Sequence, residues 1–158
     1  MSKVIQYISY EESLEVYRKT IAASDGGFAG IRDEGGIRAT LDFIQNDSYY
    51  PEFSDKLTYL VFSFCSGHYF RDGNKRIALT VGTYFLHKNG YHWEACIFMR
   101  QFEGIVYHIA ASNIDRDLFQ RMVNAFMAGV DYDEELKIDI ANAMSKGQLG
   151  IEEERDDK

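Results

Sequence analysis

Nine consecutive residues near the middle of the chain concentrate the side chains that could do chemistry. They are His68-Tyr69-Phe70-Arg71-Asp72-Gly73-Asn74-Lys75-Arg76. The run combines an imidazole, a carboxylate, an amide, a glycine and cationic groups. Among these, imidazole is the group whose ordinary pKa suits the uptake of a proton near neutral pH. His68 is therefore the candidate general base.

The second half of this run predicts a phosphate-binding loop. If a helix begins near Asn74, its first N–H groups have no partner within the helix, and the helix dipole adds positive charge there. Gly73 removes the side chain that would keep a ligand from the backbone, which is typical of phosphate sites at helix N-termini. Lys75 and Arg76 add charge to the same anion. Asp72 is placed to hold Mg²⁺, which takes one or two carboxylates together with phosphates.

Each of these residues also has a purely structural interpretation. Asp72 and Asn74 could cap the following helix, although the pattern around Asp72 favours metal binding. Lys75 could simply be solvated, and an isolated histidine such as His68 is more often an ordinary partly buried one. Phe70 is predicted to be a structural anchor that pins the loop on the core.

Two strongly apolar segments flank the run and must position it. Residues 57–65 and 77–86 are apolar on nearly every face of a helix, which is typical of helices buried in a core. Ser54 is the expected N-cap of the first, and Asn89-Gly90 the expected end of the second. A charged loop between two buried helices is costly unless partners or a ligand satisfy its groups.

Helical periodicity and capping signals predict the other elements, and the sequence has little strand pattern. Ser9-Tyr10-Glu11-Glu12 is a capping box, and the helix it starts should end before Asp25-Gly26-Gly27. Residues 30–36 are predicted to form a loop in which Arg32 and Asp33 make a surface ion pair. Further helices are expected at 37–45, at 94–112, after Asp115 as far as Gly129, and after Asp133, followed by a disordered charged tail at 152–158. The predicted fold class is all-α.

Composition restricts the possible partners. The 158 residues are expected to form one domain, and the 46% hydrophobic content is ample for a core. The net charge of −8 argues against non-specific nucleic-acid binding, which needs a basic face. No apolar run reaches the ~18 residues of a membrane span. The start Met1-Ser2-Lys3-Val4 lacks the apolar region of a signal peptide. The expected location is the cytoplasm, with no membrane partner.

The central run resembles the signature of the Fic/Doc family. Fic enzymes carry His-x-Phe-x-(Asp/Glu)-Gly-Asn-Gly-Arg, with a second Arg three residues on. Here Lys75 replaces the second glycine and Leu79 stands in place of the second Arg. Lys followed by a single Arg is typical of the death-on-curing (Doc) variant, which usually has Ala at the position of Gly73. The resemblance extends to Tyr7–Glu12 and Gly30–Gly35, so residues 1–130 are predicted to be a Fic/Doc domain and 131–158 a helical extension and tail.

The resemblance implies a helical bundle with the signature loop between two buried central helices. It implies Mg²⁺-ATP as the donor and a Ser, Thr or Tyr hydroxyl of a target protein as the acceptor. His68 would act as the base, Asp72 would hold Mg²⁺, and the phosphates would be bound by Gly73, Asn74, Lys75 and Arg76. Doc toxins phosphorylate a translation factor, elongation factor Tu, and a partner antitoxin restrains them.

Family members transfer either AMP or the terminal phosphoryl group. The resemblance implies that AMP transfer needs the space of the second glycine and the charge of the second Arg. Lys75 and Leu79 remove both, so phosphoryl transfer is favoured; AMP transfer and a nucleotide-binding module without turnover stay open. The segment Tyr49-Tyr50-Pro51 is predicted to be a packed loop, although in Fic enzymes the segment at this place is a flap that holds the target peptide. The inhibitory pattern (Ser/Thr)-x-x-x-Glu-(Gly/Asn) of self-inhibited Fic proteins is absent. Glu103-Gly104 is the nearest match, but Met99 stands at the Ser/Thr position. A separate antitoxin is therefore expected.

Overall fold

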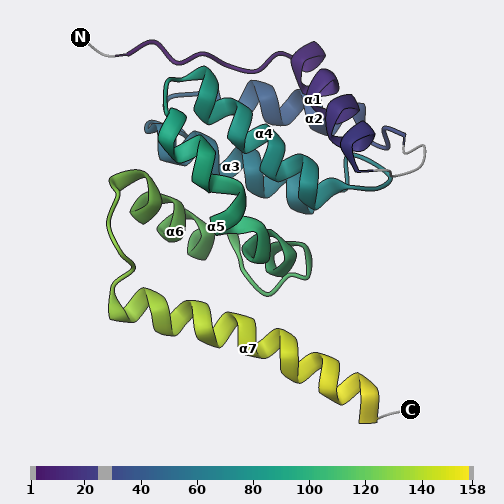
Figure 1. Cartoon of the computed structure of the whole chain (residues 1–158), viewed down its shortest axis with the longest axis vertical. Helices are drawn as coiled ribbons and strands as arrows, with labels where there is room; N and C mark the ends of the chain where they lie inside the picture. Colours follow the sequence, from purple (N-terminus) through teal and green to yellow (C-terminus); the bar gives the residue numbers. More distant parts are fainter. Residues whose placement is uncertain (1–2, 25–29, 157–158) are drawn as a thin grey trace.

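The fold is built from helices alone among the residues that the structure describes. A computed structural model describes residues 3–24 and 30–156, with side chains as far as residue 146. The helices are α1 (Tyr10–Ala23), α2 (Glu34–Phe43), α3 (Phe53–Ser66), α4 (Asn74–Lys88), α5 (His92–Ala110), α6 (Arg116–Ala128) and α7 (Glu134–Asp156) (Figure 1). The all-α prediction is confirmed. Within the same ranges, no helix has both the length and the apolar character that crossing a membrane requires.

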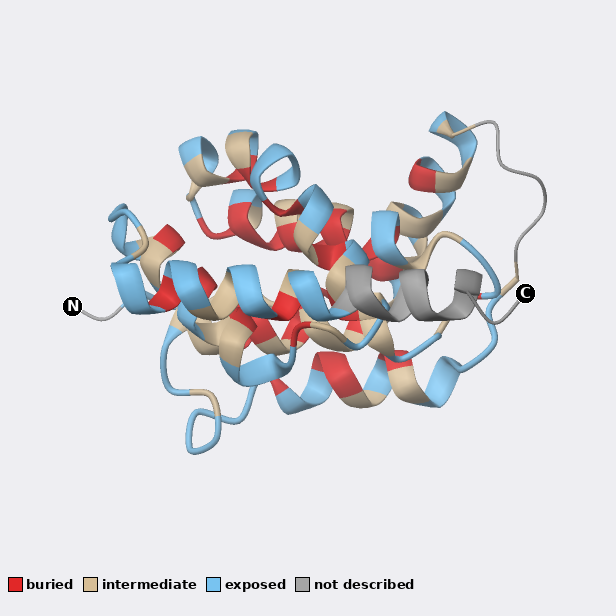
Figure 2. Ribbon diagram, turned by 90° about the horizontal axis from the view of Figure 1, so that it is seen from below, coloured by how far each residue is buried: buried red, intermediate tan, exposed pale blue. Residues whose placement is uncertain are grey.

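Helices α3 and α4 form the centre of the bundle, as their apolar sequences predict. Seven residues of each helix are buried, and the buried positions gather in the middle of the molecule (Figure 2). Gly82 allows a close approach of helices, because a Cβ there would lie 2.7 Å from both Val61 of α3 and Phe98 of α5. The signature loop is thus held between two of the best-packed helices of the fold.

Helix α1 is fastened across α4 by one carboxylate. The capping box is confirmed, since Ser9 and Glu12 exchange side-chain to backbone hydrogen bonds of 3.1 Å. The second oxygen of Glu12 accepts hydrogen bonds from Tyr84 and Lys88 of α4. Ahead of α1, the extended segment is tied to the end of α4 through Asn89, whose amide bonds the backbone N–H and C=O of Gln6.

Three helix starts differ from the sequence prediction, and one of them is only a shift, since α5 lies two residues earlier than the predicted 94–112. Helix α2 begins at Glu34 rather than near residue 37, because the Asp33 carboxylate accepts a 2.8 Å hydrogen bond from Gly36 N–H and so caps the helix. Asp33 therefore does not form the expected ion pair with Arg32. Helix α3 begins at Phe53 with Glu52 as its N-cap rather than Ser54, and the Asp55 carboxylate accepts from Glu52 N–H.

Helices α6 and α7 follow their predicted caps, and α7 runs further than expected. Asp115 accepts from Leu118 N–H, Gly129 ends α6 in a left-handed conformation, and Asp133 accepts from Leu136 N–H. Helix α7 continues to Asp156, so the tail expected to be disordered is helical in its backbone, while 157–158 lie outside the described residues. The predicted breaker at 25–27 also lies outside them. Figure 1 shows α7 lying beside α6, away from α3 and α4.

Candidate functional site

The signature run forms the tight connection between α3 and α4. Helix α3 ends at Ser66, and Gly67 N–H donates to Ser63 C=O at 2.8 Å. Gly73, seven positions after Ser66, is the N-cap of α4 and has φ 76° and ψ 14°. This left-handed conformation favours glycine because it has no Cβ. The expected start of α4 at Asn74 is confirmed.

Asn74 and Phe70 brace the loop from within. The Asn74 side chain accepts from Phe70 N–H at 3.1 Å and donates to Phe70 C=O at 2.8 Å. The Phe70 ring is fully buried and stacks on Tyr17 with a centroid distance of 4.5 Å. Phe70 therefore has the surroundings that an anchor requires. Both ends of the Asn74 amide are engaged with the loop backbone, so in this arrangement Asn74 shapes the site.

The first turn of α4 is open toward the loop. No side chain in the described part of the chain caps this helix, and its first hydrogen bond runs from Ile77 N–H to Gly73 C=O. The Asp72 side chain is exposed, and its Oδ1 accepts a 2.8 Å hydrogen bond from Gly73 N–H. Uncapped N–H groups at a helix start suit an anion.

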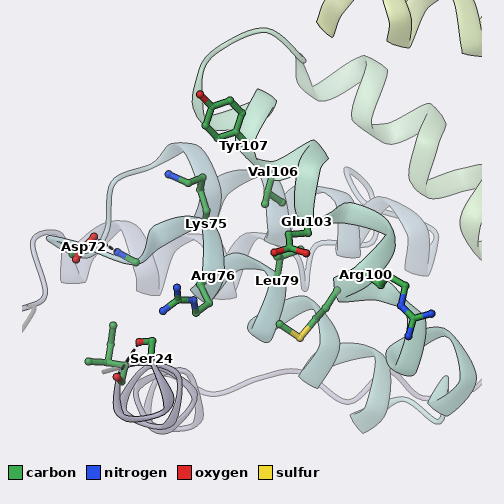
Figure 3. Close-up of a pocket in the computed structure, with 12 residues that line it drawn as sticks. Ser24, Asp72, Lys75, Arg76, Leu79, Arg100, Glu103, Val106 and Tyr107 are labelled. Atoms are coloured by element: carbon green, nitrogen blue, oxygen red, sulfur yellow. Dashed lines mark hydrogen bonds between the residues drawn. The ribbon is translucent and has the colours of Figure 1, made fainter. Parts of the chain in front are cut away.

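A cavity of ≈ 780 Å³ opens beside this turn. Its wall on the loop side consists of Asp72, Gly73, Lys75, Arg76 and Leu79 (Figure 3). Lys75 and Arg76 are exposed, whereas Leu79 is 4% exposed and offers only aliphatic surface. The cavity therefore gathers four of the seven predicted site residues, with two cations among them.

The opposite wall comes from α5 and was not predicted from the sequence. Met99, Arg100, Glu103, Val106 and Tyr107 face the cavity from this helix, and the end of α1 contributes Ile21 and Ser24 (Figure 3). The polar members, Arg100, Glu103 and Tyr107, recur three and four residues apart along the helix. That spacing places them on one helix face. It could have marked a functional face, but it could not say which cavity the face lines.

His68 lies outside the cavity lining, on the exposed turn that precedes the loop. Its side chain makes no hydrogen bond within the described part of the chain. Its backbone φ is +53°, which is uncommon for a residue that has a Cβ. Such a conformation costs roughly 1–3 kcal/mol and persists where the surroundings impose it, often at functional sites.

A short stretch before α2 pairs with the loop directly after His68. Ile31 and Phe70 form an antiparallel bridge, with Arg71 N–H donating to Gly30 C=O at 2.9 Å. Arg32 N–H and Asp33 N–H both donate to the C=O of Tyr69, at 2.8 and 3.0 Å. The sequence predicts a loop for this stretch, without its pairing to the signature run.

The donor set around Asp72 is compatible with Mg²⁺ only when a nucleotide supplies further oxygens. Within residues 3–24 and 30–156, no three His, Cys, Asp or Glu residues cluster as a metal site. Mg²⁺ usually binds one or two carboxylates and completes its shell with phosphates and water. Asp72 retains a carboxylate oxygen beside the uncapped first turn of α4, which fits this mode.

The model of the Fic/DOC family matches residues 7–86, about half of the chain. The chain belongs to the Fic/Doc family. The match includes α1 through most of α4, and therefore the whole signature loop. The α5 wall of the cavity lies beyond the part of the chain that the Fic/Doc model matches.

Two curated relatives are similar to this chain over most of their own length. The chain is 36% identical to "Protein kinase doc" of Escherichia phage P1 over 90 residues, which are 54% of this chain and 70% of that protein. It is 31% identical to "Toxin Doc" of Mycolicibacterium smegmatis over 107 residues, which are 65% of this chain and 82% of that protein. No solved structure matches the chain significantly.

Proposed function

We propose that this protein is a Doc-like toxin that transfers the terminal phosphoryl group of Mg²⁺-ATP to a Ser, Thr or Tyr hydroxyl of a target protein. A translation factor in the cytoplasm is the expected target, and a separate antitoxin chain is the expected restraint. Family membership and the names of the two relatives, a protein kinase and a toxin, support this proposal. The signature loop supplies the chemistry.

Each site residue has a role that its surroundings allow. His68 takes the proton of the acceptor hydroxyl as the hydroxyl oxygen attacks the γ-phosphorus, the bond from that phosphorus to the β–γ bridging oxygen breaks, and ADP leaves. The open turn at Gly73, together with Lys75 and Arg76, binds the negative charge of the transferring group. Asp72 would hold Mg²⁺, which would neutralise phosphate charge. Asn74 keeps the loop in shape from inside.

One observation favours phosphoryl transfer over AMP transfer. Lys75 and Leu79 both line the cavity, at the positions where AMP-transferring relatives have glycine and a second arginine. Lys75 fills space that the donor phosphates would otherwise use. Leu79 cannot replace a charge-assisted contact of order 1.5–3 kcal/mol. A donor with its γ-phosphate next to His68 avoids both problems.

The decisive experiment follows the label from ATP. A bacterial lysate is incubated with the purified chain, Mg²⁺ and ATP labelled at either the α or the γ phosphorus, with His68→Ala as the control. We expect a labelled protein only from γ-labelled ATP and only with the wild-type chain. Label arriving from the α position would instead establish AMP transfer.

The same measurement addresses the third candidate, a nucleotide-binding module without turnover. A module would bind ATP in calorimetry and yet transfer no label from either position. The presence of His68, Asp72 and Arg76 together argues against this reading, because a lost activity usually leaves a damaged site.

A further inference from the structure

Tyr69, the residue after the candidate base, is fixed by contacts of its ring, its hydroxyl and its backbone carbonyl. Its ring lies between two glycines, since a Cβ at Gly36 would come within 2.5 Å of it and a Cβ at Gly67 within 2.4 Å. The ring edge also meets Phe64, with a centroid distance of 5.4 Å and an interplanar angle of 84°. This glycine-lined socket spans α2, the end of α3 and the loop.

The polar atoms of Tyr69 are fixed as well as its ring. Its hydroxyl shares a 2.6 Å hydrogen bond with the hydroxyl of Thr40, which is 1% exposed. Burial raises the pKa of the Tyr69 hydroxyl, so the group stays protonated at neutral pH. Its C=O accepts the N–H groups of Arg32 and Asp33. Three separate parts of the chain therefore converge on one residue.

The socket explains the unusual backbone of His68. The Tyr69 ring lies over Gly67, two residues earlier, so the chain must reverse between them. His68 is the only residue available for that reversal, and it takes φ +53°. Because the His68 side chain is exposed and bonds no described residue, its own contacts do not hold this conformation. Its two neighbours hold it.

We infer that Tyr69 is a positioning residue that acts through His68. By occupying its socket, Tyr69 fixes the left-handed turn at His68 and thereby the direction of the imidazole. This inference rests on the proposed role of His68 as the base. It adds a residue at a position that the signature leaves unspecified. It also implies that the Gly30–Asp33 stretch helps to position the base, because Arg32 N–H and Asp33 N–H bind the C=O of Tyr69.

The test combines kinetics with a direct view of the imidazole. Tyr69→Phe keeps the ring in the socket and loses only the hydroxyl, whereas Tyr69→Ala empties the socket. Tyr132→Phe and Tyr132→Ala are matched controls, because Tyr132 is also partly buried and lies between α6 and α7, away from the loop. The probe is γ-labelled ATP with lysate protein as the acceptor.

We expect Tyr69→Ala to lower kcat by about 10- to 100-fold with the KM for ATP unchanged, since a misplaced catalytic group costs rate rather than donor binding. Tyr69→Phe should lose less, and the Tyr132 variants should match wild type. In the His68→Ala background, Tyr69→Ala should cause no further loss. A full additional loss in that background, or a kcat equal to wild type, would overturn the inference.

Imidazole NMR gives a readout that needs no transfer at all. The chain has four histidines, so the His68 signals can be assigned by their loss in His68→Ala. We expect one sharp set for His68 in the wild type, and broadened or split signals in Tyr69→Ala with the other three histidines unmoved. Unchanged His68 signals would refute positioning by Tyr69. A wild-type chain that transfers no label would refute the proposed function, while these spectra would still decide the role of Tyr69.

Discussion

His68 stands on a turn where its side chain contributes nothing to the packing of the core. Replacing it by alanine should therefore remove the chemistry and leave the fold intact. We expect His68→Ala to lower label transfer by at least ~10²-fold, the low end for a positioned base. The thermal midpoint should stay near that of wild type.

The matched control is His92→Ala, because His92 is also exposed and, among the described residues, its ring bonds only that of His87, at 2.7 Å. It should transfer label at the wild-type rate. Near wild-type transfer by His68→Ala would exclude the general-base role.

Lys56 is the most deeply buried charged side chain among the described residues, at 1% exposed. Its ammonium donates to Ile44 C=O at 2.7 Å and to Asp47 at 2.8 Å, and so ties the connection between α2 and α3. Lys56→Met should cost about 1–3 kcal/mol in the free energy of unfolding, because a buried carbonyl loses its donor. Urea denaturation measures this. Asp47→Asn should lower the free energy of unfolding by less, since the Asp47 side chain is 80% exposed. An equal loss would mean that Lys56 stabilises the fold through its ion pair with Asp47 and not through its hydrogen bond to the Ile44 carbonyl.

At the scale of elements, the tie between α1 and α4 makes stability depend on pH. Burial alone would raise the pKa of Glu12, but hydrogen bonds from Lys88 and Tyr84 outweigh it and lower the pKa from 4.5 to about 2. A carboxyl whose pKa is lower in the folded state stabilises that state above pH ~4.5 and loses the effect as pH falls toward ~2.

Glu12→Gln should therefore lower the free energy of unfolding at pH 7 by about 1 kcal/mol, a value discounted because the group is partly exposed. It should also flatten the decline between pH 4.5 and 2, as followed by urea denaturation. Glu15→Gln is the control, since Glu15 forms an exposed ion pair with Arg18 one turn away. If the free energy of unfolding of Glu12→Gln fell between pH 4.5 and 2 as steeply as that of wild type, the lowered pKa of Glu12 would not be the cause of the pH dependence.

Sequence patterns predicted the elements best where the signal is local. The caps at Ser9, Asp115 and Asp133 and the apolar faces of the central helices depend on residues within one or two turns. The start of α2 was misplaced because Gly35 and Gly36 suggest a loop, whereas Asp33 caps a helix that includes both. A cap outweighed the weak helix propensity of glycine.

The site was predictable only in its contiguous half. The loop residues follow one another, so their types and order were enough. The α5 wall with Glu103 and Tyr107 depends on how α5 packs beside α4, which no local pattern specifies. The hydrogen bond between Thr40 and Tyr69 joins residues 29 apart, and likewise needs the fold.

At the scale of the whole molecule, α7 lies beside α6, away from α3 and α4 (Figure 1). Among its described side chains, Leu136 and Ala143 are buried, and Asp139 forms an ion pair with Arg121 of α6. Deleting residues 133–158 should leave label transfer unchanged and lower the thermal midpoint only modestly. A chain that is silent at full length and active after this deletion would show restraint by its own C-terminus, in place of a separate antitoxin.

The signature loop, which we propose binds the donor, is already hydrogen-bonded in the free protein, and this has a consequence for amide exchange. Phe70 N–H is held by Asn74 and Arg71 N–H by Gly30. A disordered loop would lose ~1–2 kcal/mol of backbone entropy per residue on binding ATP, and this one has already lost it during folding. These two amides should exchange with solvent as slowly as amides within a helix, before ATP is added as well as after.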